Sequence, residues 1–509
     1  MIMKKKIAIA LMLMVVFVAS GMNAASAQKI GPDKIHSAVD RVAPIIKDTA
    51  MELWKLSELP LVEFKSSAYL MKVLEDNGFT IKSKGTANVP TAFVAEYGSG
   101  KPIIGIMTEY DALPGLGNEP VTKKEARKDG VTSGHGCGHN LIGAGGLGAA
   151  LALRNLIEEN KVHGVVRVYG AAAEESEGAK VYMAREGVFN DVDAMLHWHP
   201  HNVAGLWYAR TAAVGMLYVE FSGKTAHAGL EPWKGRSALD AVELFTHGVN
   251  MMREHVEPTA RLQYIIPKGG VAPNVVPDFA TVKMFYRDID RAHVEKSMIW
   301  LKQIAKGAAL ATQTETLAVD YFGMYDLLPN NVMAKRMQQH LETIGIPKYT
   351  DEETQFAKDI QKSAGVEATG MTKAIIPLPA QPPTMGGSTD VGDVSWITPT
   401  MGTFMPTIPK KIGVHTWMAT SCHGMSIGVK GATNAAKVLT ATGWDLLTDS
   451  KFMAEVKAEF RERTKGFRYK SPIPDIIKEP VLLPEDMKKH ESIVELKEYF
   501  KKHAYEEGF

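Results

Sequence analysis

The 509-residue sequence has only two cysteines, Cys137 and Cys422, which lie far apart along the chain. Small disulfide-stapled domains carry many closely spaced cysteines, so this composition excludes a disulfide framework and leaves a single Cys137–Cys422 bridge as the only pairing. A structural metal clip and an active-site role are the other two interpretations of Cys137. The neighbouring residues have to decide among the three.

A surplus of charge of one sign is also missing. The chain has 58 basic and 57 acidic residues, and removal of Lys4, Lys5 and Lys6 with an N-terminal leader leaves 55 basic residues. Such a balance offers no electrostatic attraction to nucleic acid or to an anionic membrane surface. We therefore expect neither as a partner.

Long apolar runs are absent after the first 27 residues, where no stretch reaches the roughly 18 apolar residues that a transmembrane helix needs. The N-terminus itself combines three lysines, an apolar run from Ile7 to about Ser20, and the small residues Ala25-Ser26-Ala27. This pattern is typical of a secretory signal peptide. We expect a mature chain that begins near Gln28, has no membrane span, and is periplasmic or secreted.

Two kinds of element order divide the rest of the chain. The first part predicts strands alternating with helices, which favours an α/β fold with a mixed or parallel sheet flanked by helices: strands 102–108, 164–170 and 193–198, helices 140–159 and 179–186. From about residue 212 the order becomes βαββαβ, as in ferredoxin-like domains: strands 213–222, 262–268, 279–287 and 314–322, helices 236–255 and 291–311. We expect a signal peptide, a catalytic domain in two parts, an inserted lid and a charged helical C-terminal extension: 1–27, 28–211 with 327–450, 212–326, and 451–509.

Residues that carry chemistry follow each of the three predicted strands of the first part. Two acids follow the first strand, two more follow the second, and imidazoles follow the third: Glu109 and Asp111, Glu174 and Glu175, His197 and His199. In open α/β sheets, functional groups gather beyond the carboxyl ends of the strands. Their joint placement favours one shared site over three incidental ones.

The stretch "SGHGCGHN" (133–140) adds His135, Cys137 and His139 at alternate positions. Alternate side chains of an extended segment face the same way, and imidazole and thiolate are good zinc ligands. The simpler alternative is a glycine-rich turn whose polar groups are satisfied by neighbours. A structural zinc site usually needs a second paired cluster, which this sequence lacks. His415 in "GVHTW" is a weaker further ligand candidate.

The adjacent acids Glu174 and Glu175 in "AAAEES" can serve one site only if the chain turns after the strand, because neighbouring residues of a strand face opposite sides. One carboxylate can then bind a metal while the other acts as a general base toward a metal-bound water. Two unrelated surface glutamates are the alternative.

Two further motifs favour other functions less strongly. "GAGGLG" (143–148) fits a dinucleotide-binding pattern, but it follows the ligand cluster instead of a strand, so close helix packing explains it better. "GMSIG" (424–428) fits a nucleophile elbow at Ser426, with Asp445 and His490 in the order of a serine hydrolase. The segment before it is a poor buried strand, so a serine hydrolase stays the less favoured alternative.

Nine motifs resemble, in order and spacing from about residue 35 to 450, the amidohydrolase branch of the aminoacylase and carboxypeptidase family of di-metal peptidases. They are "EYDALPGLGN", "GHGCGHNLIG", "YGAAAEESEGAK", "DAMLHWHP", "GKTAHAG", "GRSALDAV", "APNVVPD", "GGSTDVGDVSW" and "HTW". The resemblance implies a two-metal catalytic domain and an inserted lid that also forms a homodimer. It implies two divalent ions per subunit, zinc or manganese, with thiolate chemistry leaning toward zinc.

The resemblance also implies a role for each matching residue. Cys137 would bridge the metals, Glu174 would be the general base, and the remaining ligands would be His139, Glu175, His199 and His415. In the lid, His227 would reach the partner's active site and steady the oxyanion, while Asn274 and Arg287 would hold the substrate carboxylate. His135 and His197 match no ligand position, so we expect them to orient ligands or line the pocket.

These features predict an exported amidohydrolase that uses a metal-bridging water. Its substrate would be an N-acyl or N-aroyl amino acid, such as p-aminobenzoyl-glutamate, or a dipeptide, in each case with a free carboxylate. Asn140 agrees with the aminobenzoyl-glutamate group of the family and departs from its auxin-conjugate hydrolases. A non-catalytic metal- or carboxylate-binding protein is the alternative from a different class.

Overall fold

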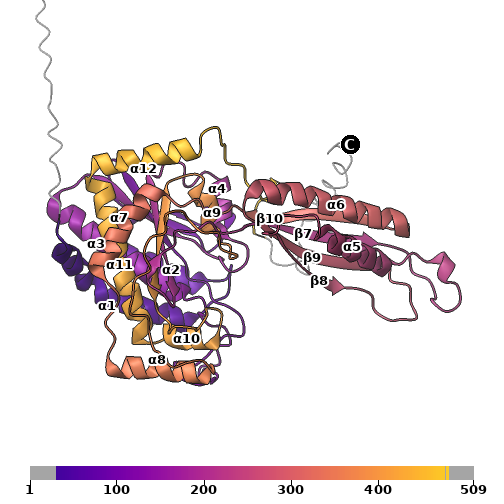
Figure 1. Ribbon diagram of the computed structural model, residues 1–509, viewed down its shortest axis with the longest axis horizontal. Helices are drawn as coiled ribbons and strands as arrows, with labels where there is room; N and C mark the ends of the chain where they lie inside the picture. The colour runs from indigo at the N-terminus through magenta and orange to yellow at the C-terminus, as the bar shows by residue number, and fades with distance from the viewer. Residues whose placement is uncertain (1–29, 476, 481–509) are drawn as a thin grey trace, which may run out of the picture.

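The computed structural model describes residues 30–475 and 477–480, so the expected signal peptide lies outside the described residues. A larger α/β part holds one sheet, and a smaller part with a second sheet projects away from it (Figure 1). The larger part is formed by residues on both sides of the smaller one in sequence. The smaller part is therefore an insertion into the larger one.

The larger part contains a seven-stranded sheet in the order β1-β2-β4-β3-β5-β11-β6. Its four central strands, β4, β3, β5 and β11, are parallel, and the outer strands β1, β2 and β6 run antiparallel to their neighbours. The expected α/β class is confirmed, with a mixed sheet. The strands are β1 Thr80–Lys84, β2 Phe93–Ser99, β3 Ile103–Thr108, β4 Gly164–Gly170, β5 Ala194–His201, β6 Gly205–Leu206 and β11 Thr400–Pro406.

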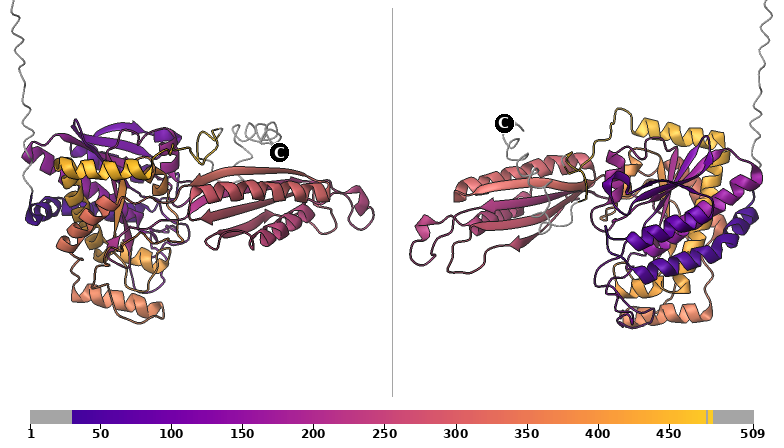
Figure 2. Two further views of the ribbon diagram at one scale, coloured as in Figure 1. Left: turned by 45° about the horizontal axis from the view of Figure 1, so that its top comes forward. Right: turned by 180° about the vertical axis from the view of Figure 1, so that it is seen from behind.

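Helices cover both faces of this sheet, and α1, α3 and α11 pack against one another (Figure 2). Apolar positions at helical spacing in α1, such as Val39, Val42 and Ile46, are buried in the shared core. The helices are α1 Pro32–Leu56, α2 Phe64–Asp76, α3 His139–Asn160, α4 Ala179–Arg185, α7 Asn331–Ile344, α8 Asp351–Ser363, α9 Val391–Ser395, α10 Trp417–His423, α11 Ser426–Thr448 and α12 Ser450–Arg463, with one 3-10 turn at Thr86–Asn88.

Helix α3 is a core helix and explains the "GAGGLG" motif. A Cβ on Gly145 would lie 2.8 Å from the indole nitrogen of Trp198, so glycine is needed for close packing. Within the described ranges α3 is also the one helix long and apolar enough to cross a membrane, and 89% of that window is buried inside the protein. The glycines therefore serve packing, and no nucleotide-binding turn is needed to account for them.

The inserted part is an antiparallel sheet in the order β10-β7-β9-β8, covered on one face by α5 and α6 (Figure 1). We call this part the lid. Side chains alternate along the strands, so Leu217, Val219 and Phe221 meet the helices while Val214, Met216 and Tyr218 face the other side. The elements are β7 Ala213–Ser222, α5 Ala238–Met252, β8 Arg261–Lys268, β9 Phe279–Asp288, α6 Arg291–Thr312 and β10 Glu315–Met324, with a 3-10 turn at Pro232–Lys234.

The C-terminal segment differs from the expected charged helical extension. Helix α12 ends at Arg463, and the described residues after it are irregular and pack onto the catalytic part. The Tyr469 hydroxyl donates to Asp393 Oδ1 at 2.7 Å, and Ile473 and Ile477 are buried. Buried isoleucines stabilise this path more than a solvated helix would. Residues 481–509 lie outside the described residues.

Candidate metal centre and active-site cavity

The candidate site lies at the carboxyl ends of the central parallel strands, as expected. Glu109 and Asp111 follow β3, and Glu174 and Glu175 follow β4. The third strand was predicted too short: β5 continues to His201, so His199 lies on the strand and not beyond it. His197 and His199 consequently face the same side of the sheet.

The Cys137 loop is held tightly where it enters α3. Gly138 has φ of 89°, and a Cβ there would lie 2.8 Å from both the His423 ring and Pro200. Only glycine fits this left-handed and crowded position. The loop thereby brings Cys137 and His139, the first residue of α3, to one side. Cys137 and Cys422 are both free thiols, so the disulfide interpretation is wrong for this structure.

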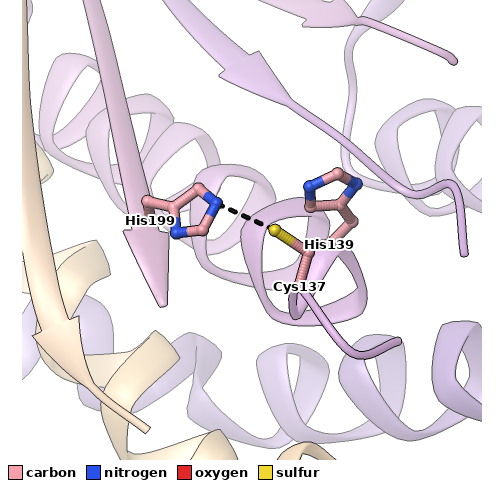
Figure 3. A group of neighbouring side chains, drawn as sticks. All are labelled: Cys137, His139 and His199. Carbon is pink, nitrogen blue, oxygen red and sulfur yellow. Dashed lines mark hydrogen bonds between the residues drawn. The ribbon is translucent and has the colours of Figure 1, made fainter. Parts of the chain in front are cut away.

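Cys137 belongs to two groups of potential metal ligands at once. Its sulfur lies 3.3 Å from His199 Nε2, and these two residues form one group with His139 (Figure 3). Cys137 also forms a group with Glu175 and His415, and in each group the ligand atoms lie within 4.8 Å of one another. A thiolate shared by two ligand groups is the arrangement that a metal-bridging cysteine requires.

The donor atoms of these groups fit divalent cations. His139 Nε2 and Glu175 Oε1 are buried and have no hydrogen-bond partner among the described residues. Buried polar atoms normally find partners, and a metal ion satisfies both of these. Burial, with the charge of His139 adding to it, lowers the pKa of His199 to about 3, so its imidazole is neutral, as a metal ligand must be.

Asp111 orients two of the ligand candidates, a role that the sequence did not reveal. Its Oδ1 lies 2.8 Å from His139 Nδ1, and its Oδ2 accepts the Glu175 backbone N–H at 2.9 Å. A carboxylate behind a histidine fixes the ring so that Nε2 points at the metal. The position of Asp111 after β3 was the available signal, since the motif "EYDALPGLGN" contains it.

A fully buried lysine, Lys180, lies behind the acidic side of the site. Its ammonium group is 2.8 Å from Glu109 Oε1 and 2.6 Å from Asp390 Oδ1. Burial raises the pKa of Glu174 well above the usual value, and the charges of Glu109, Asp390 and Glu175 raise it further. So many carboxylates around one lysine favour bound cations. Neither Lys180 nor Asp390 had been assigned a role, although both lie in motifs quoted above.

A cavity of about 610 Å³ opens from this cluster toward the lid. The ligand groups line it on one side, while the lid contributes an aromatic and apolar wall together with two cations, Lys283 and Arg287. Arg287 Nη1 donates to Ser388 Oγ at 3.0 Å, and no acidic side chain among the described residues pairs with this guanidinium. Burial lowers the pKa of Arg287, so an incoming carboxylate would meet a desolvated fork of donors.

His227 and Asn274 do not lie at this cavity. Arg287 pairs with Val214 at the near end of β7, whereas His227 and Asn274 follow and precede the far ends of β7 and β9. Eight residues of strand separate the two ends by roughly 27 Å. The expectation that Asn274 and Arg287 hold one carboxylate is therefore wrong within a single chain. They can meet only across two chains.

His135 and His197 make no contact that places them among the ligands. His135 Nε2 lies 3.0 Å from the Leu53 carbonyl oxygen, and its Nδ1 accepts the Asn140 backbone N–H, so this ring steadies the start of α3. The His197 ring packs 5.3 Å from Trp207, centroid to centroid, and is not among the residues that line the cavity.

The serine-hydrolase motif is not assembled as a triad. Ser426 is the first residue of α11, and its hydroxyl donates to Glu353 at 2.5 Å. Asp445 lies 19 residues further along the same helix, which places it about 28 Å away, and it pairs with Arg336 and His340. His490 lies outside the described residues.

Comparison with known proteins agrees with this geometry. Residues 105–416 match the model of peptidase family M20/M25/M40. The chain belongs to this family. It is therefore a metallohydrolase of the peptidase and amidohydrolase type, as the resemblance of its motifs predicted.

Relatives and solved structures of the family resemble this chain over most of its length. It is 36% identical to one of the two named subunits of the p-aminobenzoyl-glutamate hydrolase of Escherichia coli, over 86% of this chain and 97% of the relative. It is 26% identical to the mouse Xaa-Arg dipeptidase, over 87% and 94%. In fold it is similar to a dinuclear metal-binding M20 peptidase of Bacillus subtilis, with a TM-score of 0.52, 17% identity, and coverage of 79% and 99%.

Proposed function

We propose that this M20 hydrolase cleaves the amide bond between an acyl or aroyl group and an amino acid that keeps a free carboxylate. The observation that carries this proposal is one cavity with the ligand groups around Cys137 on one side and, on the other, Arg287, which has no acidic partner among the described residues. The aromatic wall, including Trp207, Phe285 and Tyr321, suits an aroyl group. Similarity to the Escherichia coli p-aminobenzoyl-glutamate hydrolase supports an N-aroyl-glutamate as the first substrate to test.

The roles of the residues follow from their places around the cavity. Cys137, His139, Glu175, His199 and His415 would hold two divalent ions, zinc by thiolate softness or manganese. When bound, these ions supply a nucleophilic water at neutral pH and polarise the scissile carbonyl. Glu174, which lines the cavity, takes a proton from the attacking water and passes it to the leaving amine nitrogen as the C–N bond breaks. Arg287 holds the substrate carboxylate.

Hydrolysis of matched substrates tests this function. We expect purified protein to hydrolyse p-aminobenzoyl-glutamate, N-benzoyl amino acids or dipeptides, and to act about tenfold to a hundredfold more slowly on the α-carboxamide of its best substrate, because the buried guanidinium loses its charged partner. Arg287→Met should remove this discrimination. Arg261→Met is the matched control, since Arg261 pairs with Arg287 across the sheet but is exposed.

Turnover that ignores the carboxylate would contradict the role of Arg287. Two bound ions with no turnover on any substrate would favour a non-catalytic metal- or carboxylate-binding protein. We also propose that the chain is exported, on the pattern of its first 27 residues.

We propose further that a second copy of this chain covers the far end of the lid. His227 Nδ1 accepts the backbone N–H groups of Gly229 and Leu230, so the proton of its ring lies on Nε2, free to donate outward. Apolar side chains around it are exposed, including Trp233 at 69% and Val271 at 94%. Exposed apolar clusters of this kind mark interaction surfaces. A partner's cavity would bring His227 to the developing oxyanion.

Mixing two inactive variants tests this arrangement. His227→Ala and Arg287→Met chains, dissociated and reassembled together, should recover about a quarter of wild-type activity, because half of the dimers are mixed and each contains one complete site. Recovery no greater than the sum of the separate variants would contradict the cross-chain role. Because the Escherichia coli hydrolase has two differently named subunits, a different protein is the alternative partner, and a monomer at micromolar concentration would favour it.

A further inference from the structure

The two adjacent glutamates of the site face one cavity because the chain turns sharply before them. Strand β4 ends at Gly170, and Ala173 then has φ of 54°, the left-handed region. The Ala173 carbonyl oxygen accepts the N–H groups of Ser176 and Gly178 at 3.3 and 2.7 Å. Both Glu174 and Glu175 consequently line the cavity. A residue with a side chain adopts this conformation only when its surroundings hold it there.

The group that holds the turn is the side chain of Glu63. Its Oε1 accepts the Ala173 backbone N–H at 2.8 Å, and its Oε2 accepts the hydroxyl of Thr91 at 2.6 Å. Thr91 is itself fixed, because its carbonyl oxygen accepts the hydroxyl of the buried Tyr110 at 2.6 Å. Glu63 is therefore anchored at both carboxylate oxygens, far in sequence from the residue that it holds.

Glu63 does not serve the local purpose that its position suggests. It is the N-cap of α2, where an acidic side chain normally accepts an N–H of its own helix, yet it makes no such bond. It is fully buried, and burial, with the charge of Asp111 adding to it, raises the pKa of its carboxyl group to about 7. A carboxyl group kept in so unfavourable a place calls for a compensating role.

We propose that Glu63 is a positioning residue for hydrolysis: by holding Ala173 in its left-handed turn, it aims Glu174 and Glu175 into the same cavity. The proposal rests on the proposed function, in which Glu174 moves the proton and Glu175 binds metal. Glu63 precedes residues 105–416, which match the family model, so the catalytic turn depends on a segment outside that match.

Three variants separate this role from general support of the fold. Glu63→Met keeps the length of the side chain but removes the acceptor, and we expect kcat to fall about thirtyfold with KM within about threefold, since the proton-accepting group is misaimed. Adding Ala173→Gly should restore kcat about tenfold, because glycine enters the left-handed region without a steric penalty. Ala172→Gly in the same Glu63→Met background is the matched control and should restore nothing.

A second measurement reads the same turn without turnover. Zinc affinity of Glu63→Met should fall about tenfold, because Glu175 follows the same turn, and Ala173→Gly but not Ala172→Gly should recover it. Glu63→Gln retains an acceptor oxygen and should recover most of both quantities. A Glu63→Met protein with wild-type kcat and zinc affinity, or equal rescue by the two glycines, would overturn the proposal. Wild-type protein with no amide hydrolysis would instead reject the proposed function, and zinc affinity would still decide the role of Glu63.

Discussion

Glu174→Gln should lower kcat by about a hundredfold to ten-thousandfold, the range that a positioned general base contributes, while two metal ions remain bound. The amide has the volume of the carboxyl group but cannot take up the proton of the attacking water. Glu174 is the better candidate for this role than Glu175, because Glu175 lies with Cys137 and His415 as a ligand. Steady-state kinetics in excess zinc and elemental analysis of the same sample measure both quantities.

Glu177→Gln is the matched control for this substitution. Glu177 lies in the same segment and lines the same cavity, but it belongs to none of the ligand groups among the described residues. We expect less than a tenfold change in its kcat, since it moves no proton in the reaction. Normal hydrolysis by Glu174→Gln, with the loss appearing in Glu177→Gln, would show that the base is assigned to the wrong residue.

Removal of divalent ions should abolish hydrolysis, by about a thousandfold or more, because both the nucleophile and the carbonyl polarisation are lost together. The buried and unpartnered His139 Nε2 and Glu175 Oε1 are the physical reason to expect this dependence. Dialysis against a chelator, followed by zinc or manganese, measures the loss and its reversal. Zinc should act at lower concentration, since thiolate and imidazole are its preferred ligands.

The serine-hydrolase alternative predicts the opposite results. Ser426→Ala and treatment with a serine-directed organophosphate should leave turnover unchanged, because Ser426 is bonded to Glu353 and has no histidine partner among the described residues. Activity that survives the chelator but is lost with Ser426→Ala would instead place the chemistry on the serine. The two treatments therefore distinguish the two enzyme classes.

The central sheet and the metal cluster were predictable because local patterns encode them. β3, β4 and β7 read as short apolar or alternating runs, and the ends of parallel strands meet at one edge of a sheet. The acids and imidazoles after those strands therefore had to come together. The shared role of Cys137 could be inferred from the motif resemblance, and the two ligand groups give it a geometry.

The rest depends on contacts between distant segments, which no local pattern encodes. Lys180 meets Asp390 and Glu63 meets Ala173 across 210 and 110 positions of sequence. The end of β5 was misplaced because Trp198 and Pro200 separate its histidines, and parallel pairing with β11 extends it to His201. The C-terminal segment reads as charged, yet two isoleucines bury it against the catalytic part. Tertiary packing overrides local propensity at each of these places.

The most direct test is a zinc titration of metal-free protein in which hydrolysis and bound ions are measured together. If Cys137 bridges two metals, hydrolysis of the best N-aroyl amino acid should reach its plateau at two ions per chain, and Cys137→Ala should neither reach that plateau nor bind both ions tightly. Cys422→Ala, which removes the other buried thiol far from the ligand groups, should behave as the wild type. Full hydrolysis by the metal-free protein, or a Cys137→Ala variant that binds two ions and turns over normally, would contradict the account.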